Sequence, residues 1–318
     1  MIYLLLVLWL IMALCILGEY RNIRLIIYLC VFSAITSLAF FMLGSPDAAM
    51  AEAAIGAFTT IFFIICFEKY SELKIDKKNQ QIDRENKQKT PQTFWLKLKK
   101  YLLPLIFTLV LAGLFINFIP MGEVNTYLKD LYLLNFMENV GGENAVTAIY
   151  LGYRMYDTLF EALVLVVAVV AVVHMSYTDD FFVRQGRPSY VGRYKVVVSV
   201  LRLVCAVILL YGIYLIVNGH LSAGGGFQGG LFIAAFFVCR YLIYDIYDIP
   251  IKKVFKMEEF IFFSIILLAI FLVFLGVMQD MPRIVQESYM IIMNLLVGLK
   301  VACGFLILFY RYVAIERR

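Results

Sequence analysis

The stretch VVVSVLRLVCAVILLYGIYLIV at residues 196–217 decides the fold class. Arg202 is its only charged side chain. About 20 predominantly apolar residues let an α-helix cross the roughly 30 Å hydrocarbon core of a bilayer, and this run is long enough to do so. Similar runs recur along the chain, so the sequence predicts an all-α integral membrane protein.

The composition supports the same conclusion. Hydrophobic residues make up 63% of the chain and charged residues 16%, with a mean hydropathy of +0.86. Soluble domains average about 45–50% apolar and about 25% charged residues. The six cysteines all lie in apolar runs and form no CxxC pair, which argues against a disulfide framework, a zinc site or an iron–sulfur site.

We predict about nine transmembrane helices. The first run lacks the basic start and cleavage site of a secretory signal, so we interpret it as a span. The predicted spans are residues 2–18, 23–43, 48–67, 101–119, 157–175, 196–217, 229–246, 258–279 and 289–310.

The distribution of basic residues predicts the orientation. Of the 28 lysines and arginines, 22 fall in one set of alternating loops and the C-terminus, counting Arg24 at the edge of the second span. Three fall in the other set, and three lie well inside spans. Cytoplasmic loops carry the excess of lysine and arginine in membrane proteins. We therefore expect the N-terminus outside and the C-terminus in the cytoplasm.

Two long segments outside the predicted spans divide the chain, one charge-dense and one of mixed apolar and polar residues. Residues 68–100 form a charge-dense segment, which we predict to be a cytoplasmic linker. Residues 120–156 form an outer segment that is too long for a tight turn and has room for a helix lying on the membrane surface. The predicted organisation is a three-helix unit at 1–67, the linker, a two-helix unit at 101–178 and a four-helix unit at 179–318.

Three motifs on this topology carry a family resemblance: SPDAAMAEAAIGA at 45–57, ENAVTAIYLGYRMYDTLFEA at 143–162 and NGHLSAGGGFQGGLFIAA at 218–235. The first two resemble adjoining pieces of the C-terminal region of the A subunit of Mrp-type multisubunit Na+/H+ antiporters. The third resembles the B subunit of the same complexes. Ala223 and Phe160 depart from the family pattern, which usually has proline and commonly glycine at these positions.

The resemblance implies a role in a larger complex. In the antiporters the A-subunit pieces follow a long antiporter-like domain that is absent here, whereas in energy-converting membrane-bound hydrogenases they are small separate subunits. The resemblance therefore implies a non-catalytic membrane subunit in the Na+/H+ antiport module of a membrane-bound hydrogenase or related respiratory oxidoreductase. Two alternatives stay open: a subunit of a stand-alone Mrp-type antiporter, or a purely structural scaffold subunit.

The resemblance also implies partners, ions and location. We expect Na+ or H+ as transported ions, and other membrane subunits of an Mrp-like complex as partners, with hydrogenase-like and iron–sulfur subunits among them. Nickel–iron and iron–sulfur centres are expected only in partner subunits, and no cofactor or metal in this chain. The implied location is the plasma or inner membrane of a prokaryote, with the chain crossing it many times, and nothing in the sequence suggests binding to nucleic acid.

Charged residues inside the predicted spans are the candidates for an ion pathway, because charge in hydrocarbon is costly. Glu52 lies about 6 Å below the outer end of the third span at 1.5 Å per residue. Lys300 is the deepest charge, about 16 Å into the ninth span. Asp245, nearer the inner end of the seventh span, is the one carboxylate of the sixth to eighth spans that comes near that depth. We therefore expect the partner of Lys300 to be Glu52, Glu161 or a residue of another chain.

A second group lies at the outer end of the fifth span. Arg154, Asp157 and Glu161 share one helical face by their spacing, and Thr158 adds an oxygen one turn along. Such a stripe fits a hydrated cation entrance, and it equally fits an ordinary ion-paired cap at the membrane interface.

The glycine-rich string between the sixth and seventh spans is the third candidate. No predicted strand precedes it and it lies between two spans, which argues against a phosphate-binding loop. Small residues permit an irregular helix start and close packing, so the string fits a polar vestibule or a tight helix contact. The vestibule candidates are His220, Gly224, Gly225, Gly226 and Gln228. The other histidine, His174, lies on the opposite face of the membrane, which excludes a bis-histidine haem within one chain.

Overall fold

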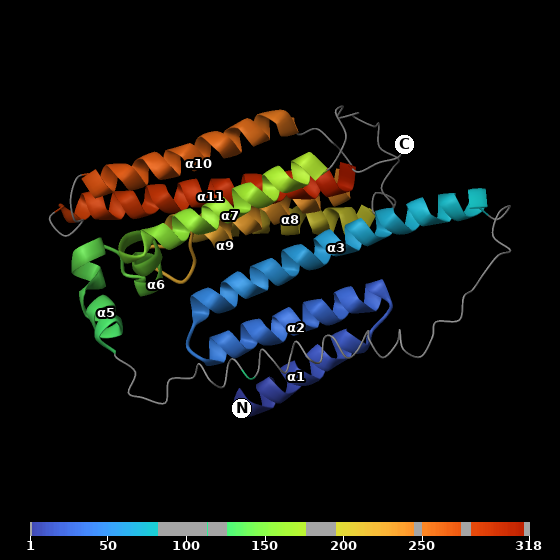
Figure 1. The fold of residues 1–318 in the computed structure, drawn as a ribbon, viewed down its shortest axis with the longest axis horizontal. Coiled ribbons are helices and arrows are strands. Elements are labelled where there is room, and N and C mark those ends of the chain that lie inside the picture. Colours follow the sequence, from blue (N-terminus) through green and yellow to red (C-terminus); the bar gives the residue numbers. More distant parts are fainter. Residues whose placement is uncertain are drawn as a thin grey trace. The chain divides into compact units, whose positions relative to one another are not determined.

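A computed structural model of the chain describes residues 2–81, 113, 126–175, 195–244, 250–274 and 281–314. These residues are helical with short connections and contain no strand, as the sequence predicts. The helices, labelled in Figure 1, are α1 (Ile2–Gly18), α2 (Asn22–Met42), α3 (Pro46–Gln81), α5 (Tyr127–Val140), α6 (Ala145–Ala148), the π-helix η1 (Ile149–Tyr153), α7 (Met155–Met175), α8 (Lys195–Asn218), α9 (Gly226–Tyr244), α10 (Ile251–Phe274) and α11 (Arg283–Ala314).

Five described helical segments have the length and apolar character of membrane spans, at Asn22–Met42, Pro46–Phe67, Met155–Met175, Val198–Asn218 and Arg283–Tyr312. Two shorter apolar helices, Leu4–Gly18 and Gly226–Tyr241, coincide with two further predicted spans. The predicted span at 101–119 lies outside the described residues except for Gly113. The structure therefore confirms a multi-spanning helical protein.

Several helices extend beyond the predicted spans. Helix α3 continues to Gln81, into the segment that we predict to be a linker. Helix α10 begins at Ile251 and not at residue 258, and α11 begins at Arg283 and not at residue 289. Proline precedes both helices, at Pro250 and Pro282, and the carbonyls of these prolines accept the first backbone hydrogen bonds of the helix. Hydropathy locates the apolar part of a helix and misses its polar ends.

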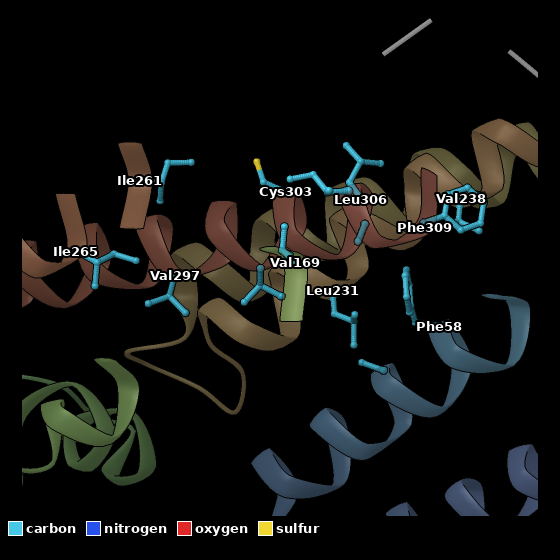
Figure 2. Packing of buried hydrophobic residues seen from close by; sticks show 14 of the residues in the cluster. Phe58, Val169, Leu231, Val238, Ile261, Ile265, Val297, Cys303, Leu306 and Phe309 are labelled. Carbon is cyan, nitrogen blue, oxygen red and sulfur yellow. The ribbon is translucent and has the colours of Figure 1, made fainter. Parts of the chain in front are cut away.

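The described helices belong to two compact units, one formed by residues 1–73 and 132–318 and the other by residues 74–131. Within the first unit, α11 is the central helix: it contacts α7, α8, α9 and α10. Figure 1 shows these helices running alongside one another. Figure 2 shows the core between them, where Val297 and Leu306 of α11 lie close to Val169, Leu231 and Ile265 of neighbouring helices.

Glycines set the distance between α9 and α11. A side chain added at Gly226 would place its Cβ 2.5 Å from the carbonyl oxygen of Asn294, and one added at Gly230 would collide with the carbonyl oxygen of Gly298. The backbones of the two helices are therefore in direct contact. Such close approach by small residues is the usual way in which helices associate inside a bilayer.

Aromatic rings attach α3 to α11. Phe58 packs edge-on against Phe305 at a centroid distance of 5.1 Å, and Phe62 contacts Phe309 at 6.2 Å. Phe58 and Phe309 are labelled in Figure 2, where Phe58 projects from α3 toward the other helices. The N-terminal third of the chain is thereby joined to the same core as the C-terminal third.

The α9–α11 contact yields a prediction. Gly230→Ala should destabilise the chain by about 1–3 kcal/mol, because the new methyl group meets backbone and the helices must separate. The expected result is a lower midpoint of thermal denaturation of the detergent-solubilised protein. Gly18→Ala is the matched control, since a Cβ at Gly18 meets nothing within 4 Å. Equal denaturation midpoints for the two variants would contradict the direct backbone contact.

Candidate functional site

The most deeply buried charges of the described chain form an ion pair. The Lys300 side chain of α11 donates a hydrogen bond to Oε1 of Glu258 on α10, with an Nζ–Oε1 distance of 2.6 Å. The side chains of Lys300 and Glu258 are 0% and 1% exposed. The expectation that the partner is Glu52, Glu161 or another chain is therefore wrong: this chain supplies the partner from its own α10.

The error has a clear cause. The predicted eighth span starts at residue 258, which puts Glu258 at the membrane surface. The helix starts seven residues earlier, at Ile251, and so Glu258 lies about 10 Å along it. Helices α10 and α11 pack against each other, and the long lysine side chain covers the remaining distance to the carboxylate.

The pair lies near the middle of the apolar length of α11. The apolar segment runs from Arg283 to Tyr312, and Lys300 is about 18 Å from its C-terminal end at 1.5 Å per residue. The ammonium group also faces the ring of Phe262, 5.5 Å from its centroid. An aromatic face attracts a cation and offers partial compensation for lost water.

Asn294 forms a second buried polar group on α11, about 9 Å from Lys300 along the helix. Its Oδ1 accepts hydrogen bonds from the Tyr150 hydroxyl at 2.9 Å and from the backbone N–H of Gly226 at 3.0 Å. Because the Gly226 amide can only donate, this contact fixes the orientation of the Asn294 amide. Its Nδ2 is buried with no hydrogen-bond partner in the described chain.

The third polar group lies at the N-terminal end of α3. Asp47 Oδ1 accepts a hydrogen bond from the backbone N–H of Gly224 at 2.9 Å and one from Asn144 Nδ2 at 3.2 Å. Asn144 Nδ2 also contacts the carbonyl oxygens of Gly219 and Ser222, and Asn144 Oδ1 caps α6. Asp47 and Asn144 are both 8% exposed. This network joins all three of the sequence motifs.

The glycine-rich string starts α9 irregularly, as predicted. Gly224 and Gly225 have φ angles of +149° and +152°, which favour glycine. His220 is buried, and its Nδ1 lies 3.0 Å from the carbonyl oxygen of Val217. Gln228 is also buried, and its Oε1 and the Tyr150 hydroxyl both lie beside Gly225. Gln228 and the glycines therefore lie together beside the Tyr150 hydroxyl, whereas the His220 ring faces a carbonyl of its own helix end.

A π-helix places Tyr150 in this group. The turn of η1 frees backbone carbonyls, and two side chains satisfy them: Thr158 donates to the Tyr150 carbonyl at 2.6 Å and Tyr289 donates to the Leu151 carbonyl at 2.9 Å. Burial raises the pKa of the Tyr150 hydroxyl, which therefore stays protonated and serves as a donor to Asn294. Single π-helical turns occur frequently at functional sites.

The predicted stripe on the fifth span is only partly formed. Arg154 and Asp157 make an ion pair with an Nη2–Oδ2 distance of 2.5 Å, and their side chains are 60% and 54% exposed. Glu161 is also exposed on the described chain. Thr158 is 3% exposed and its hydroxyl bonds Tyr150, so it belongs to the buried network and not to the exposed stripe.

Glu52 lies apart from these groups, between α2 and α3. Its Oε1 accepts a hydrogen bond from Ser33 Oγ at 2.7 Å, and its side chain is half-buried. Gly56 allows this contact, because a Cβ there would collide with the Ser33 hydroxyl.

Sequence reasoning missed several polar residues that the fold buries, among them Asp47, Asn144, Glu258 and Asn294, and also the partly buried Tyr150. Asp47 and Asn144 belong to two of the family motifs, and this could have marked them as candidates. Asn294 lies inside an apolar run, where a polar side chain could also have been recognised as a candidate. In the described ranges, no group of three or more histidine, cysteine, aspartate or glutamate side chains is arranged to hold a metal ion.

Comparison with known families finds two matches. Residues 196–309 match the family described as a domain related to the MnhB subunit of Na+/H+ antiporter. Residues 7–72 match the MbhD family, described as a subunit of MBH. The two matches fall on α8–α11 and on α1–α3, the helices that carry the buried ion pair and the Glu52 and Asp47 carboxylates.

Individual proteins show the same similarity. A Staphylococcus haemolyticus protein named as antiporter subunit mnhA2 is 25% identical over 146 residues, which are 45% of this chain and 16% of that protein. A chain in the structure of the Mrp complex from Dietzia sp. DQ12-45-1b has the same fold, with a TM-score of 0.74 at 17% identity over 98% of this chain. The aligned part is 34% of the Dietzia chain.

A respiratory complex also contains a similar chain. In the structure of the membrane-bound sulfane sulfur reductase (MBS), an archaeal respiratory membrane complex, one chain aligns with a TM-score of 0.54 at 26% identity. The alignment covers 66% of this chain and 96% of that one. The present chain thus spans well under half of the antiporter subunit and of the Dietzia chain, and nearly all of the MBS chain.

Proposed function

We propose that this Mrp-type antiporter-like chain is a membrane subunit of a multisubunit complex that translocates cations and protons, and that its buried Lys300–Glu258 pair is part of the translocation pathway. We further propose that the complex is a membrane-bound hydrogenase or related respiratory oxidoreductase with an attached Na+/H+ antiport module. The match to the MbhD family and the likeness to an MBS chain support this second step.

The buried ion pair carries the proposal. Transferring two charges out of water costs several kcal/mol per ion, and replacing such a pair by well-packed apolar residues is often neutral or stabilising, by about 1–4 kcal/mol. Stability alone therefore gives little reason to keep Lys300 and Glu258. Charged residues inside membrane segments mark ion and proton pathways, and a lysine that alternates between charged and neutral forms suits a proton relay.

In this proposal the remaining polar groups surround the pathway. Glu52, Arg154, Asp157 and Glu161 serve as cation or proton contacts at its periphery. Thr158 acts indirectly, since its hydroxyl holds the π-helical turn that positions Tyr150. The vestibule residues His220, Gln228 and the glycines Gly224, Gly225 and Gly226 form a polar entrance next to Asn294. The transported ions are Na+ and H+, and nickel–iron and iron–sulfur centres reside in partner subunits.

The proposed topology has nine spans, with the N-terminus outside and the C-terminus in the cytoplasm of a prokaryote. The strongly uneven distribution of lysine and arginine between alternating loops supports it. In this orientation Asp47, Asn144 and the glycine string face the outside, and Lys300–Glu258 lies inward of them.

Two alternatives differ in what they expect of the pair. A stand-alone antiporter would also use it, whereas a structural scaffold subunit would not. The likeness to nearly the whole of one MBS chain favours the redox-linked complex over a stand-alone antiporter.

The role of the pair yields a prediction. Lys300→Met and Glu258→Gln should each lower Na+/H+ exchange by everted membrane vesicles containing the whole complex by about tenfold or more, equivalent to ~1.4 kcal/mol. Glu287→Gln is the matched control, because Glu287 makes an exposed ion pair with Arg283. Normal exchange in both pair variants, with normal amounts of complex, would indicate a scaffold subunit.

A second prediction concerns composition. Mass spectrometry of the gently solubilised, affinity-purified native complex should identify antiporter-like subunits together with hydrogenase-like and iron–sulfur subunits. Antiporter-like subunits alone would indicate a stand-alone antiporter. Recovery of this chain as a lone homo-oligomer would contradict membership of any such complex.

A further inference from the structure

A hollow of about 200 Å3 opens between α2 and α3. Its lining includes Ser33, Glu52, Gly56, Thr59, Thr60 and Phe63. We propose that a transmembrane helix of another subunit packs over this hollow and places a lysine or arginine side chain in it, against Glu52. The inference rests on the proposed function, because it requires a partner subunit in the same membrane.

The Glu52 carboxylate is incompletely satisfied by this chain. Among the described residues it accepts a hydrogen bond from the Ser33 hydroxyl at 2.7 Å, and it forms no ion pair with any of them. Glu52 lies six residues after Pro46, about 9 Å along α3, within an apolar segment that runs to Phe67. A half-buried carboxylate at this position faces the hydrocarbon region if nothing covers it.

Lipid is a poor cover for such a group. Acyl chains offer no hydrogen-bond donor, and charged side chains in membrane segments face protein or water and pair with one another. Glu258 of the same chain illustrates the usual solution, since Lys300 pairs with it directly. Glu52 has the same chemical requirement and an open hollow beside it.

The required cation is not available from the neighbouring segments of this chain. Helix α1 and the apolar part of α3 contain no lysine, arginine or histidine, and neither does the predicted span at 101–119. Arg24 of α2 lies nine residues before Ser33, about 13 Å along that helix. It makes an ion pair with Glu19, with an Nη1–Oε2 distance of 3.7 Å. None of these segments supplies a basic group for Glu52, and in our proposal another chain supplies it.

The rest of the hollow suits the stem of a long basic side chain. Thr59 and Thr60 direct their hydroxyls to the carbonyls of their own helix, at Ile55 and Gly56. The walls therefore present mainly apolar surface apart from Ser33 and Glu52. Lysine and arginine lay their methylene groups on apolar surface and extend the charged end to a polar partner.

Photo-crosslinking in the native complex tests the inference. A benzophenone amino acid at position 63, in place of Phe63, should cross-link to a peptide of another subunit whose apolar helix contains a lysine or arginine, as identified by mass spectrometry. The same probe in place of Val31, which is 40% exposed and does not line the hollow, is the control and should not give this adduct.

A second variant tests the charge. Glu52→Gln should lower the recovery of the cross-linked subunit in stringent detergent at least about threefold relative to Glu287→Gln, because the interfacial ion pair is lost. Adducts only to lipid, to residues 101–119, to a second copy of this chain or to a partner helix without lysine or arginine would overturn the inference. The proposed function would stand in those cases if the partner subunits still co-purified, and both would fail if none did.

Discussion

The contact between Lys300 and Glu258 is a constraint that the C-terminal helices must satisfy for as long as either charge is present. A lysine near the middle of a membrane helix has no water to solvate its charge. The Glu258 carboxylate, 2.6 Å away, provides the main compensation for the lost hydration. Removing either partner of such a pair leaves a buried charge, at a cost of about 3–5 kcal/mol. Helices α10 and α11 must therefore keep a fixed register, and α7, α8 and α9 pack around the same α11.

The N-terminal end of α3 follows a different principle. Asp47 is a buried carboxylate whose hydrogen-bond donors are the neutral amides of Gly224 and Asn144. Because these donors come from the α8–α9 connection and from the residue before α6, the start of α3 is tied to both. The Asn294–Tyr150–Gly226 group continues this polar region into the bundle. A polar region that begins near one membrane face and leads toward a buried ion pair is the layout expected of an ion pathway.

Much of this fold could be predicted from the sequence because the bilayer imposes a simple rule on helix length and polarity. Seven of the nine predicted spans coincide with apolar helices of the described residues, and the two family models match residues that contain the first and third motifs. The partner of Lys300 could not be predicted, since Glu258 belongs to the polar first turns of α10, which hydropathy does not assign to a helix. The sequence also could not predict where the Thr158 side chain points. Its spacing suggests a place in the stripe with Asp157, but its hydroxyl donates to the Tyr150 carbonyl that the π-helical turn of η1 leaves free.

The most direct test is to replace both partners at once. The double variant Lys300→Met, Glu258→Met removes the buried charges without leaving one unpaired, so the complex should assemble in normal amounts. Na+/H+ exchange by everted vesicles of this variant should nevertheless fall to the level of vesicles that lack the complex. Exchange at the wild-type rate in the assembled double variant would show that the ion pair takes no part in translocation.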